Sequence, residues 1–303
     1  MNSKTDISKI RTITVVGGGT MGLGIAQVAA MGGFSTRLFD IQQDQLERAQ
    51  SKIYSNLDKG VSLGKVDAKT AAAAKDRLEI STDLDAMLTG ADMMIEAIPE
   101  KMALKRELFA KADALMGDHA ILASNTSGLS ISEIGEATSC PDRVIGMHFF
   151  NPVHIMKLIE IIRSQKTSAE TFAVTEAVSK AMGKETVEVN ESAGFVTSRV
   201  NALIGNEAFR MWEAGVASPE DIDKALKLGL NHPMGPFELV DLVGLDVRAA
   251  SLGNLHEHLG ATYEPCPIIL DLVKAGRLGR KVAQGVYRYD DEGRRIPGSA
   301  ELP

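Results

Sequence analysis

A histidine and a glutamate lie close together in a strongly apolar part of the sequence. His148 lies at the end of a predicted strand, and Glu160 interrupts the apolar run from Leu158 to Ile162. A carboxylate among leucine and isoleucine side chains is costly to bury unless it is paired. The turn predicted at Asn151-Pro152 allows the two segments to lie side by side, so that Glu160 could hold the imidazole as a general base for a hydroxyl proton. On these residues alone, the alternative is a core histidine and a glutamate on a solvated sheet face.

A glycine-rich turn follows the first apolar strand. Residues 17–22 read G-x-G-x-x-G, with Gly17 suited to the tight turn, Gly19 to the approach of a pyrophosphate, and Gly22 to close helix–sheet packing. The helix that opens at Thr20 and Met21 would offer free N–H groups to the phosphates.

The next strand ends in Asp40, an acidic residue at the distance that dinucleotide-binding folds require. Its carboxylate can accept hydrogen bonds from a ribose 2′-hydroxyl and would repel a 2′-phosphate. The sequence therefore favours NAD over NADP. The alternative is a structural glycine turn with Asp40 as a helix cap.

A polar turn, residues 124–128, follows another apolar strand. Small hydroxyl and amide side chains at the carboxyl end of a strand lie where open α/β sheets bind ligands. Ser127 could therefore donate a hydrogen bond to a substrate oxygen. An equally plain interpretation is a polar turn that caps the helix predicted at residues 130–136.

The elements that position these residues alternate along the first 190 residues. Short apolar runs separated by helical patterns indicate a parallel sheet covered on both faces. The predicted strands are 12–16, 36–40, 78–81, 92–98, 120–124, 143–149, 157–162 and 186–189. Beyond residue 190 the pattern is helical, except for a strand expected at 285–289. We expect an α/β fold, a Rossmann-like, doubly wound, mostly parallel sheet in residues 1–190, followed by an all-helical domain in residues 191–303.

The composition excludes several classes of protein. The chain has 303 residues, a net charge of −7 and 44% hydrophobic residues, which suits one large domain or two modest ones. The acidic balance argues against a nucleic-acid partner, and no apolar run reaches the roughly 20 residues that span a bilayer. Cys140 and Cys266 lie far apart, and no histidine–cysteine cluster predicts a metal. The segment 1–11 lacks an apolar signal core, so we expect a cytoplasmic protein.

Together these motifs resemble the short-chain L-3-hydroxyacyl-CoA dehydrogenases, and within them the bacterial 3-hydroxybutyryl-CoA dehydrogenases. The resemblance covers about residues 10–290. It is carried by the glycine turn, residues 95–100 (IEAIPE), 124–127 (SNTS), 148–152 (HFFNP) with Glu160, 193–195 (AGF) and 233–238 (PMGPFE).

The resemblance implies the reversible oxidation of L-3-hydroxyacyl-CoA by NAD to 3-ketoacyl-CoA and NADH. His148 would take the 3-hydroxyl proton while hydride leaves C3 for the nicotinamide. Glu160 would orient and support the imidazolium, and Ser127 would hold the substrate oxygen.

The same resemblance implies further contacts. Glu100, Lys105, Asn151 and Lys281 would help to hold NAD, although Lys105 could instead belong to a solvated helix face, residues 101–111. A helical hairpin insertion near residues 43–75 would cover the substrate cleft. Its Asn56 and Lys59 would contact the acyl-CoA, unless its lysines form only a solvated face. The helical C-terminal domain would make a homodimer.

Two positions depart from the family pattern. Ser198 replaces an asparagine that binds the substrate oxygens, so a water or Asn201, one helical turn on, could take over that role. The family's lysine-threonine-glycine becomes Lys281-Val282-Ala283, which leaves the lysine but changes the loop beside it.

Two other functions stay open at this point. One is a related NAD dehydrogenase of a free hydroxy acid or sugar acid, as in lambda-crystallin-like relatives. The other is an NAD-binding regulator without turnover, which would have no need for a buried acid–base pair. The preferred acyl-chain length and the pathway, whether fatty-acid oxidation, butanoate synthesis or aromatic-acid breakdown, are not determined by these motifs.

Overall fold

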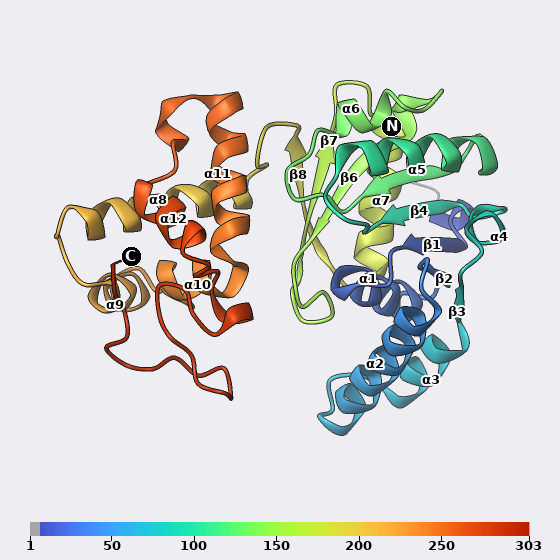
Figure 1. The fold of residues 1–303 in the computed structure, drawn as a ribbon. Helices are drawn as coiled ribbons and strands as arrows, with labels where there is room; N and C mark the ends of the chain where they lie inside the picture. Colours follow the sequence, from blue (N-terminus) through green and yellow to red (C-terminus); the bar gives the residue numbers. More distant parts are fainter. Residues whose placement is uncertain (1–6, 303) are drawn as a thin grey trace. The chain divides into compact units, whose positions relative to one another are not determined.

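The computed structural model describes residues 7–302 of the chain. The expectation made from residues 1–11 therefore falls partly outside the described residues. The chain divides into two compact units, Met1–Ser192 and Ala193–Pro303, whereas the sequence pattern placed the change near residue 190. The two units are labelled by element in Figure 1.

The first unit contains one sheet with the strand order β3-β2-β1-β4-β5-β6-β7-β8. Neighbouring strands are parallel except for the antiparallel pair β6–β7. The chain starts in the middle of the sheet and builds outward in both directions, which is the doubly wound arrangement expected. The strands are β1 (Thr12–Val16), β2 (Ser35–Phe39), β3 (Leu78–Ser81), β4 (Met93–Glu96), β5 (Ile121–Ser124), β6 (Val144–Phe149), β7 (Leu158–Arg163) and β8 (Glu185–Asn190).

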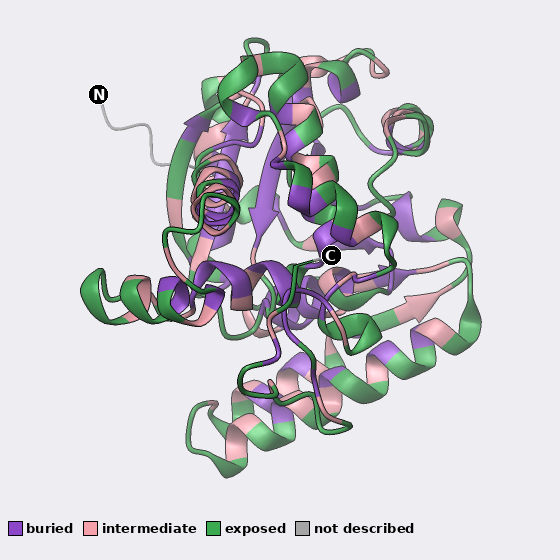
Figure 2. Cartoon of the chain, turned by 60° about the vertical axis from the view of Figure 1, so that its left-hand side comes forward, coloured by how far each residue is buried: buried purple, intermediate pink, exposed green. Residues whose placement is uncertain are grey.

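Helices cover both faces of this sheet, and the strands between them are largely buried (Figure 2). One face packs against α1 (Thr20–Met31), α2 (Gln43–Ser62) and α7 (Ala169–Ala181), and α3 (Ala68–Asp76) packs against α1 and α2; all four helices share one apolar core with the sheet. The other face contacts α4 (Leu84–Leu88), α5 (Met102–Leu115) and α6 (Ile131–Gly135). Two short 3₁₀ helices, Ile7–Lys9 and Pro141–Arg143, complete the unit.

The alternation of side chains along the strands determines which polar groups share a face. Ile95, Ala123, Met147 and Ile159 belong to the apolar core that contains α1. Because successive strand residues point to opposite faces, their neighbours point to the face of α4, α5 and α6. Those neighbours are Glu96, Ser124, His148 and Glu160. Four polar side chains from four adjacent strands are thereby placed on one side of the sheet.

The second unit is helical, as expected, and has its own apolar core around Phe209 and Phe237. Its helices are α8 (Thr197–Glu213), α9 (Pro219–Gly229), α10 (Pro236–Val243), α11 (Leu245–Leu259) and α12 (Pro267–Lys274), with 3₁₀ helices at Ala261–Tyr263 and Arg280–Val282.

The strand expected at 285–289 is not formed, and only isolated bridges occur there. The N–H groups of Val286 and Tyr287 instead donate to the buried carboxylate of Asp241, at 2.8 and 2.9 Å. A side chain therefore takes the hydrogen bonds that a neighbouring strand would have taken.

Within residues 7–302, no helix combines the length and the apolar character that crossing a membrane requires.

Candidate active site

His148 and Glu160 lie directly opposite each other in the antiparallel pair β6–β7. The Nδ1 atom of His148 is 2.7 Å from the Oε2 atom of Glu160. Glu160 is fully buried and His148 is 8% exposed, so the alternative of a glutamate on a solvated sheet face is wrong. The ring of His148 also packs against Phe150, with ring centroids 4.5 Å apart. With Nδ1 held by a carboxylate, Nε2 is the ring nitrogen suited to accept a proton.

Ser127 lies in the turn that follows β5, at the carboxyl edge of the sheet where β6 also ends. Its side chain is exposed, and its N–H donates to the Oε1 atom of Glu100 at 3.0 Å. The Ser127 hydroxyl is 3.4 Å from the same oxygen, which is long for a hydroxyl donor. The cap of α6 is Ser130, whose Oγ accepts from the N–H of Glu133. The Ser127 hydroxyl is therefore not used to cap that helix.

The glycine turn has the shape that a bound pyrophosphate requires. Gly17 has φ of +110°, and a Cβ there would lie 2.5 Å from the carbonyl oxygen of Ala97. A Cβ on Gly22 would lie 1.7 Å from the carbonyl oxygen of Gly17, so α1 could not pack as closely on the turn. At Gly19 a Cβ would meet nothing within 4 Å, and no side chain caps the helix N-terminus. The turn thus leaves free N–H groups and open space at the start of α1 for an anionic group.

Asp40 holds the backbone of the glycine turn. Its Oδ2 atom accepts from the N–H of Gly18 at 2.8 Å, and its Oδ1 atom accepts from the N–H of Gln42 at 3.0 Å. The N-cap of α2 is Gln42, so the alternative of Asp40 as the helix cap is wrong. The carboxylate is half-buried beside the turn, which is the position from which a ribose hydroxyl would be bound.

Lys105 is buried, in contrast to the alternative of a solvated helix face. Its side chain is 1% exposed, and its Nζ atom lies 2.6 Å from Glu96 Oε1 and 3.1 Å from Glu100 Oε2. Glu96 was not identified from the sequence as a site residue. The signal was present, because Glu96 ends an apolar strand just as Glu160 interrupts one. Its partner is supplied by the helix that follows.

Asn151, Asn56 and Lys59 also lie in the first unit. Asn151 is exposed in the turn between β6 and β7. The amide of Asn56 donates to the buried Gln27 of α1 at 3.1 Å, so that group is already used within the fold. Lys59 is exposed and lines an open hollow of about 780 Å³ along α2, together with Tyr54.

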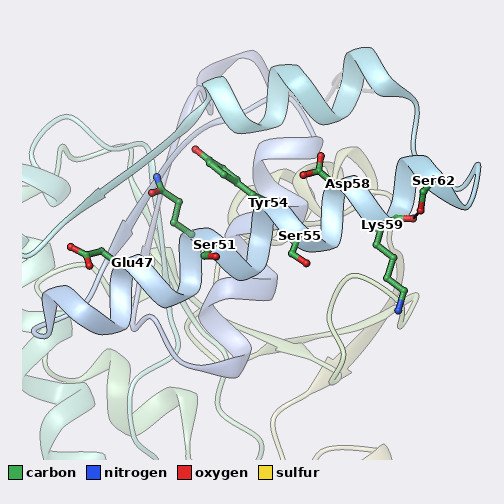
Figure 3. Close-up of a pocket in the computed structure, with 8 residues that line it drawn as sticks. Glu47, Ser51, Tyr54, Ser55, Asp58, Lys59 and Ser62 are labelled. Atoms are coloured by element: carbon green, nitrogen blue, oxygen red, sulfur yellow. Dashed lines mark hydrogen bonds between the residues drawn. The ribbon is translucent and has the colours of Figure 1, made fainter.

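In Figure 3 the ammonium of Lys59 extends from α2 in the opposite direction to Asp58. Asp58 is paired with Lys75 at 2.6 Å. Of the two residues on this helix that were expected to bind the substrate, only Lys59 is charged, and its exposed ammonium is available to an anionic ligand.

Ser198 and Lys281 belong to the second unit. Ser198 lies in the first turn of α8 and is half-buried, whereas Asn201 lines an apolar groove of about 340 Å³ with Val200 and other residues of that unit. Lys281 forms an ion pair with Asp246, at 2.5 and 2.6 Å to its two oxygens. Ala283, two residues further along the chain, adopts φ of +57°, a left-handed conformation that favours glycine.

A doubly wound sheet with an open glycine turn and an acidic residue after the second strand defines the class of dinucleotide-binding proteins. A buried histidine–carboxylate pair near the same edge is a group of the kind that acid–base catalysis requires. A model of the 3-hydroxyacyl-CoA dehydrogenase NAD-binding domain matches residues 12–192, and a model of the C-terminal domain of that family matches residues 194–289. The chain therefore belongs to the 3-hydroxyacyl-CoA dehydrogenase family.

Relatives along the whole chain agree with this assignment. A probable 3-hydroxybutyryl-CoA dehydrogenase from Bacillus subtilis is 45% identical over 285 residues, which cover 94% of this chain and 99% of the relative. The human mitochondrial hydroxyacyl-coenzyme A dehydrogenase is 40% identical over 289 residues, covering 92% and 91% of the two chains. The crystal structure of (S)-3-hydroxybutyryl-CoA dehydrogenase from Ralstonia eutropha matches with a TM-score of 0.90 and 42% identity, covering 93% and 100%. The resemblance first seen in the motifs is confirmed.

Proposed function

We propose that the protein catalyses the reversible NAD-dependent oxidation of short-chain (3S)-3-hydroxyacyl-CoA, such as 3-hydroxybutyryl-CoA, to the 3-ketoacyl-CoA. The observation that carries this proposal is the 2.7 Å contact between His148 Nδ1 and Glu160 Oε2 near the carboxyl end of β6. It provides a proton acceptor whose orientation is set by a neighbouring strand. Bound NAD supplies the hydride acceptor for the C3 hydrogen of the substrate.

His148 is the general base for the 3-hydroxyl proton. As the hydroxyl becomes a ketone, Nε2 of His148 takes the proton and the ring becomes an imidazolium. Glu160 stabilises that cation, and its effect is strong because the carboxylate is fully buried. In the direction of reduction the same proton returns to the substrate oxygen.

Ser127 donates a hydrogen bond to the substrate oxygen. Its hydroxyl is exposed at the carboxyl edge, and its backbone N–H is fixed by Glu100. A positioned donor near an oxygen that gains negative charge lowers the barrier of such reactions. Ser198 or Asn201 of the second unit is proposed as a further contact to the substrate oxygens.

The cofactor is proposed to be NAD. The open space at Gly19 accommodates the pyrophosphate, with the N–H groups at Thr20 and Met21 facing it, and Asp40 binds the adenine ribose. Glu100, Lys105, Asn151 and Lys281 are proposed to help hold NAD. The ammonium of Lys105 is held by Glu96 and Glu100 in a buried position, whereas Lys281 pairs with Asp246 at the surface.

The acyl-CoA and a second copy of the chain are the proposed partners. Lys59 would contact the coenzyme A part of the substrate, and Asn56 of the same helix would do so only through its side-chain oxygen, because its amide nitrogen donates to Gln27. Exposed large apolar side chains on the second unit support a homodimer through that unit. They include Val200, Leu228, Leu230, Leu242, Val243 and Val247.

A steady-state assay tests this function directly. We expect oxidation of NADH with acetoacetyl-CoA, and a much lower kcat/KM with free acetoacetate. Equal efficiency with both substrates would favour a dehydrogenase of free hydroxy acids. Tight NADH binding without turnover of either substrate would favour an NAD-binding regulator. A series of 3-ketoacyl-CoA substrates from C4 to longer chains would define the acyl-chain preference.

A further inference from the structure

A buried ion pair joins the end of β4 to α5. The Oε1 atom of Glu96 is 2.6 Å from Nζ of Lys105, and the two side chains are 0% and 1% exposed. Removing two such charges from water is costly, and their attraction offsets the cost only if further hydrogen bonds complete the geometry. The additional hydrogen bonds of this pair all lead to residues at the carboxyl edge of the sheet.

The first set of bonds starts at the second oxygen of Glu96. Its Oε2 atom accepts from the hydroxyl of Ser124 at 2.6 Å, and the Ser124 oxygen accepts from the N–H of Thr126 at 3.2 Å. Ser124 and Thr126 are both buried. Glu96 therefore holds the beginning of the turn that carries Ser127.

The second set starts at Lys105. Its Nζ atom is also 3.1 Å from Glu100 Oε2. The other oxygen of Glu100 accepts from the hydroxyl of Thr126 at 2.6 Å and from the N–H of Ser127 at 3.0 Å. Glu96, Ser124, Thr126, Glu100 and Lys105 thus form a closed ring of contacts, and Ser127 is bonded to one member of it.

We propose that Glu96 is a positioning residue that sets both the Ser127 turn and the Lys105 ammonium; this rests on the proposed function. Glu96 is fully buried, so it acts through its neighbours. Its Oε1 atom orients the ammonium of Lys105, which is proposed to bind NAD. Its Oε2 atom orients the turn that carries Ser127, which is proposed to bind the substrate. A single buried carboxylate then adjusts cofactor binding and catalysis together.

The test compares Glu96→Gln, Ser124→Ala and Lys105→Met with the wild-type protein. Glutamine has the shape of glutamate and can still bond to Ser124, but it removes the negative charge that faces Lys105. We expect Glu96→Gln to lower kcat about 10- to 100-fold and to raise the Kd for NADH at least about threefold, because small misplacements of reacting groups are costly. Ser124→Ala should lower kcat with little change in the Kd for NADH. Lys105→Met should raise that Kd.

A matched control comes from the ion pair between Asp113 and Arg143. Their side chains are each 11% exposed and the contact is 2.9 Å long, and Arg143 lies at the opposite end of β6. Asp113→Asn should lower the thermal stability of the protein but leave kcat and the Kd for NADH near wild type. If Glu96→Gln behaves in the same way as this control, Glu96 is merely structural and the proposal is wrong.

Two further outcomes are also decisive. If Glu96→Gln does not fold, the proposal depends on Ser124→Ala, and an unchanged kcat in that variant overturns it. If the wild-type protein does not reduce acetoacetyl-CoA, the proposed function fails. In that case the claim that Glu96 positions Lys105 is tested only by the NADH titration of Glu96→Gln. An unchanged Kd for NADH in that variant overturns the claim.

Discussion

His148 and Glu160 are paired across the antiparallel strands β6 and β7, with Nδ1 and Oε2 2.7 Å apart. Directly opposed residues in such a ladder are held by the hydrogen bonds of the strands themselves. The pair is therefore positioned by the sheet rather than by a loop. Substitution of either side chain should leave the fold intact and change only the chemistry.

The first prediction concerns this pair. Glu160→Gln should lower kcat for acetoacetyl-CoA reduction about 10- to 100-fold with KM changed little, because the imidazolium loses its counter-charge. His148→Gln should lower kcat by at least about 100-fold, because glutamine cannot take up and release the proton of the substrate hydroxyl. Steady-state kinetics measure both effects, with thermal unfolding as the control for folding. A His148→Gln variant that keeps the wild-type kcat would refute the assignment of the base.

The second prediction separates two glycines of the same turn. A Cβ at Gly22 would lie 1.7 Å from a carbonyl oxygen, whereas one at Gly19 would meet nothing within 4 Å. Gly22→Ala should therefore destabilise the apoprotein by more than about 2 kcal/mol, while Gly19→Ala should stay within about 0.5 kcal/mol of wild type.

Gly19→Ala should nevertheless weaken NADH binding at least about tenfold, because the added methyl group fills the space that the pyrophosphate needs. Urea unfolding and fluorescence titration with NADH measure the two quantities. If Gly19→Ala binds NADH as tightly as the wild type does, the pyrophosphate does not approach the turn at that residue.

The third prediction concerns the choice between NADH and NADPH. The carboxylate of Asp40 should repel a 2′-phosphate, so kcat/KM with NADPH should be at least about 100-fold lower than with NADH. Ile41, the next residue, is 79% exposed. The double variant Asp40→Ser with Ile41→Arg should reduce this preference at least about tenfold.

Ile41→Arg alone is the control for this experiment, because it adds the positive charge but keeps the carboxylate. Serine at position 40 can still accept from the N–H of Gly18, which limits damage to the turn. An unchanged NADH/NADPH ratio in the double variant would show that Asp40 does not face the adenine ribose.

The fourth prediction is a pH dependence of stability in the second unit. Burial raises the pKa of Asp223 to about 6 from its ordinary value of 3.8, although its Oδ1 atom accepts from the N–H of Phe237 and its Oδ2 atom from the hydroxyl of Tyr287. Between these values the folded state keeps a proton that the unfolded chain has lost. The contribution of Asp223 to the free energy of unfolding is therefore fully present below about pH 3.8, falls as the pH rises from there, and is lost above about pH 6.

Urea unfolding of the wild type and Asp223→Asn at about pH 4.5 and about pH 7.5 tests this dependence. The single tryptophan of the chain, Trp212, lies in the second unit, and its ring centroid is 5.7 Å from that of Phe237. Its fluorescence therefore reports on the right part of the protein. The wild type should lose stability relative to the variant as the pH rises. A difference that does not vary with pH would contradict the raised pKa.

The pairing of His148 with Glu160 and the shape of the glycine turn could be predicted because their signals are local. Glu160 stands among apolar residues, and a turn precedes its strand. Because that turn makes β7 run back along β6, and side chains alternate between the two faces, Glu160 lies opposite His148 on the same face. The G-x-G-x-x-G turn is defined by the backbone conformations and close contacts that only glycine permits, and these follow from residue type and spacing. The doubly wound class follows from the same alternation of strands and helices.

Only the tertiary structure decided which charges are buried and what they bind. Lys105 is one of two lysines on α5, and its burial depends on its ion pair with Glu96, the last residue of β4. Residues 285–289 have the composition of a strand, yet their N–H groups bind Asp241, more than forty residues earlier in the chain. Local patterns report which faces are apolar. The partner of a buried polar group is chosen by packing between distant segments, because each such group must find a hydrogen bond wherever the fold supplies one.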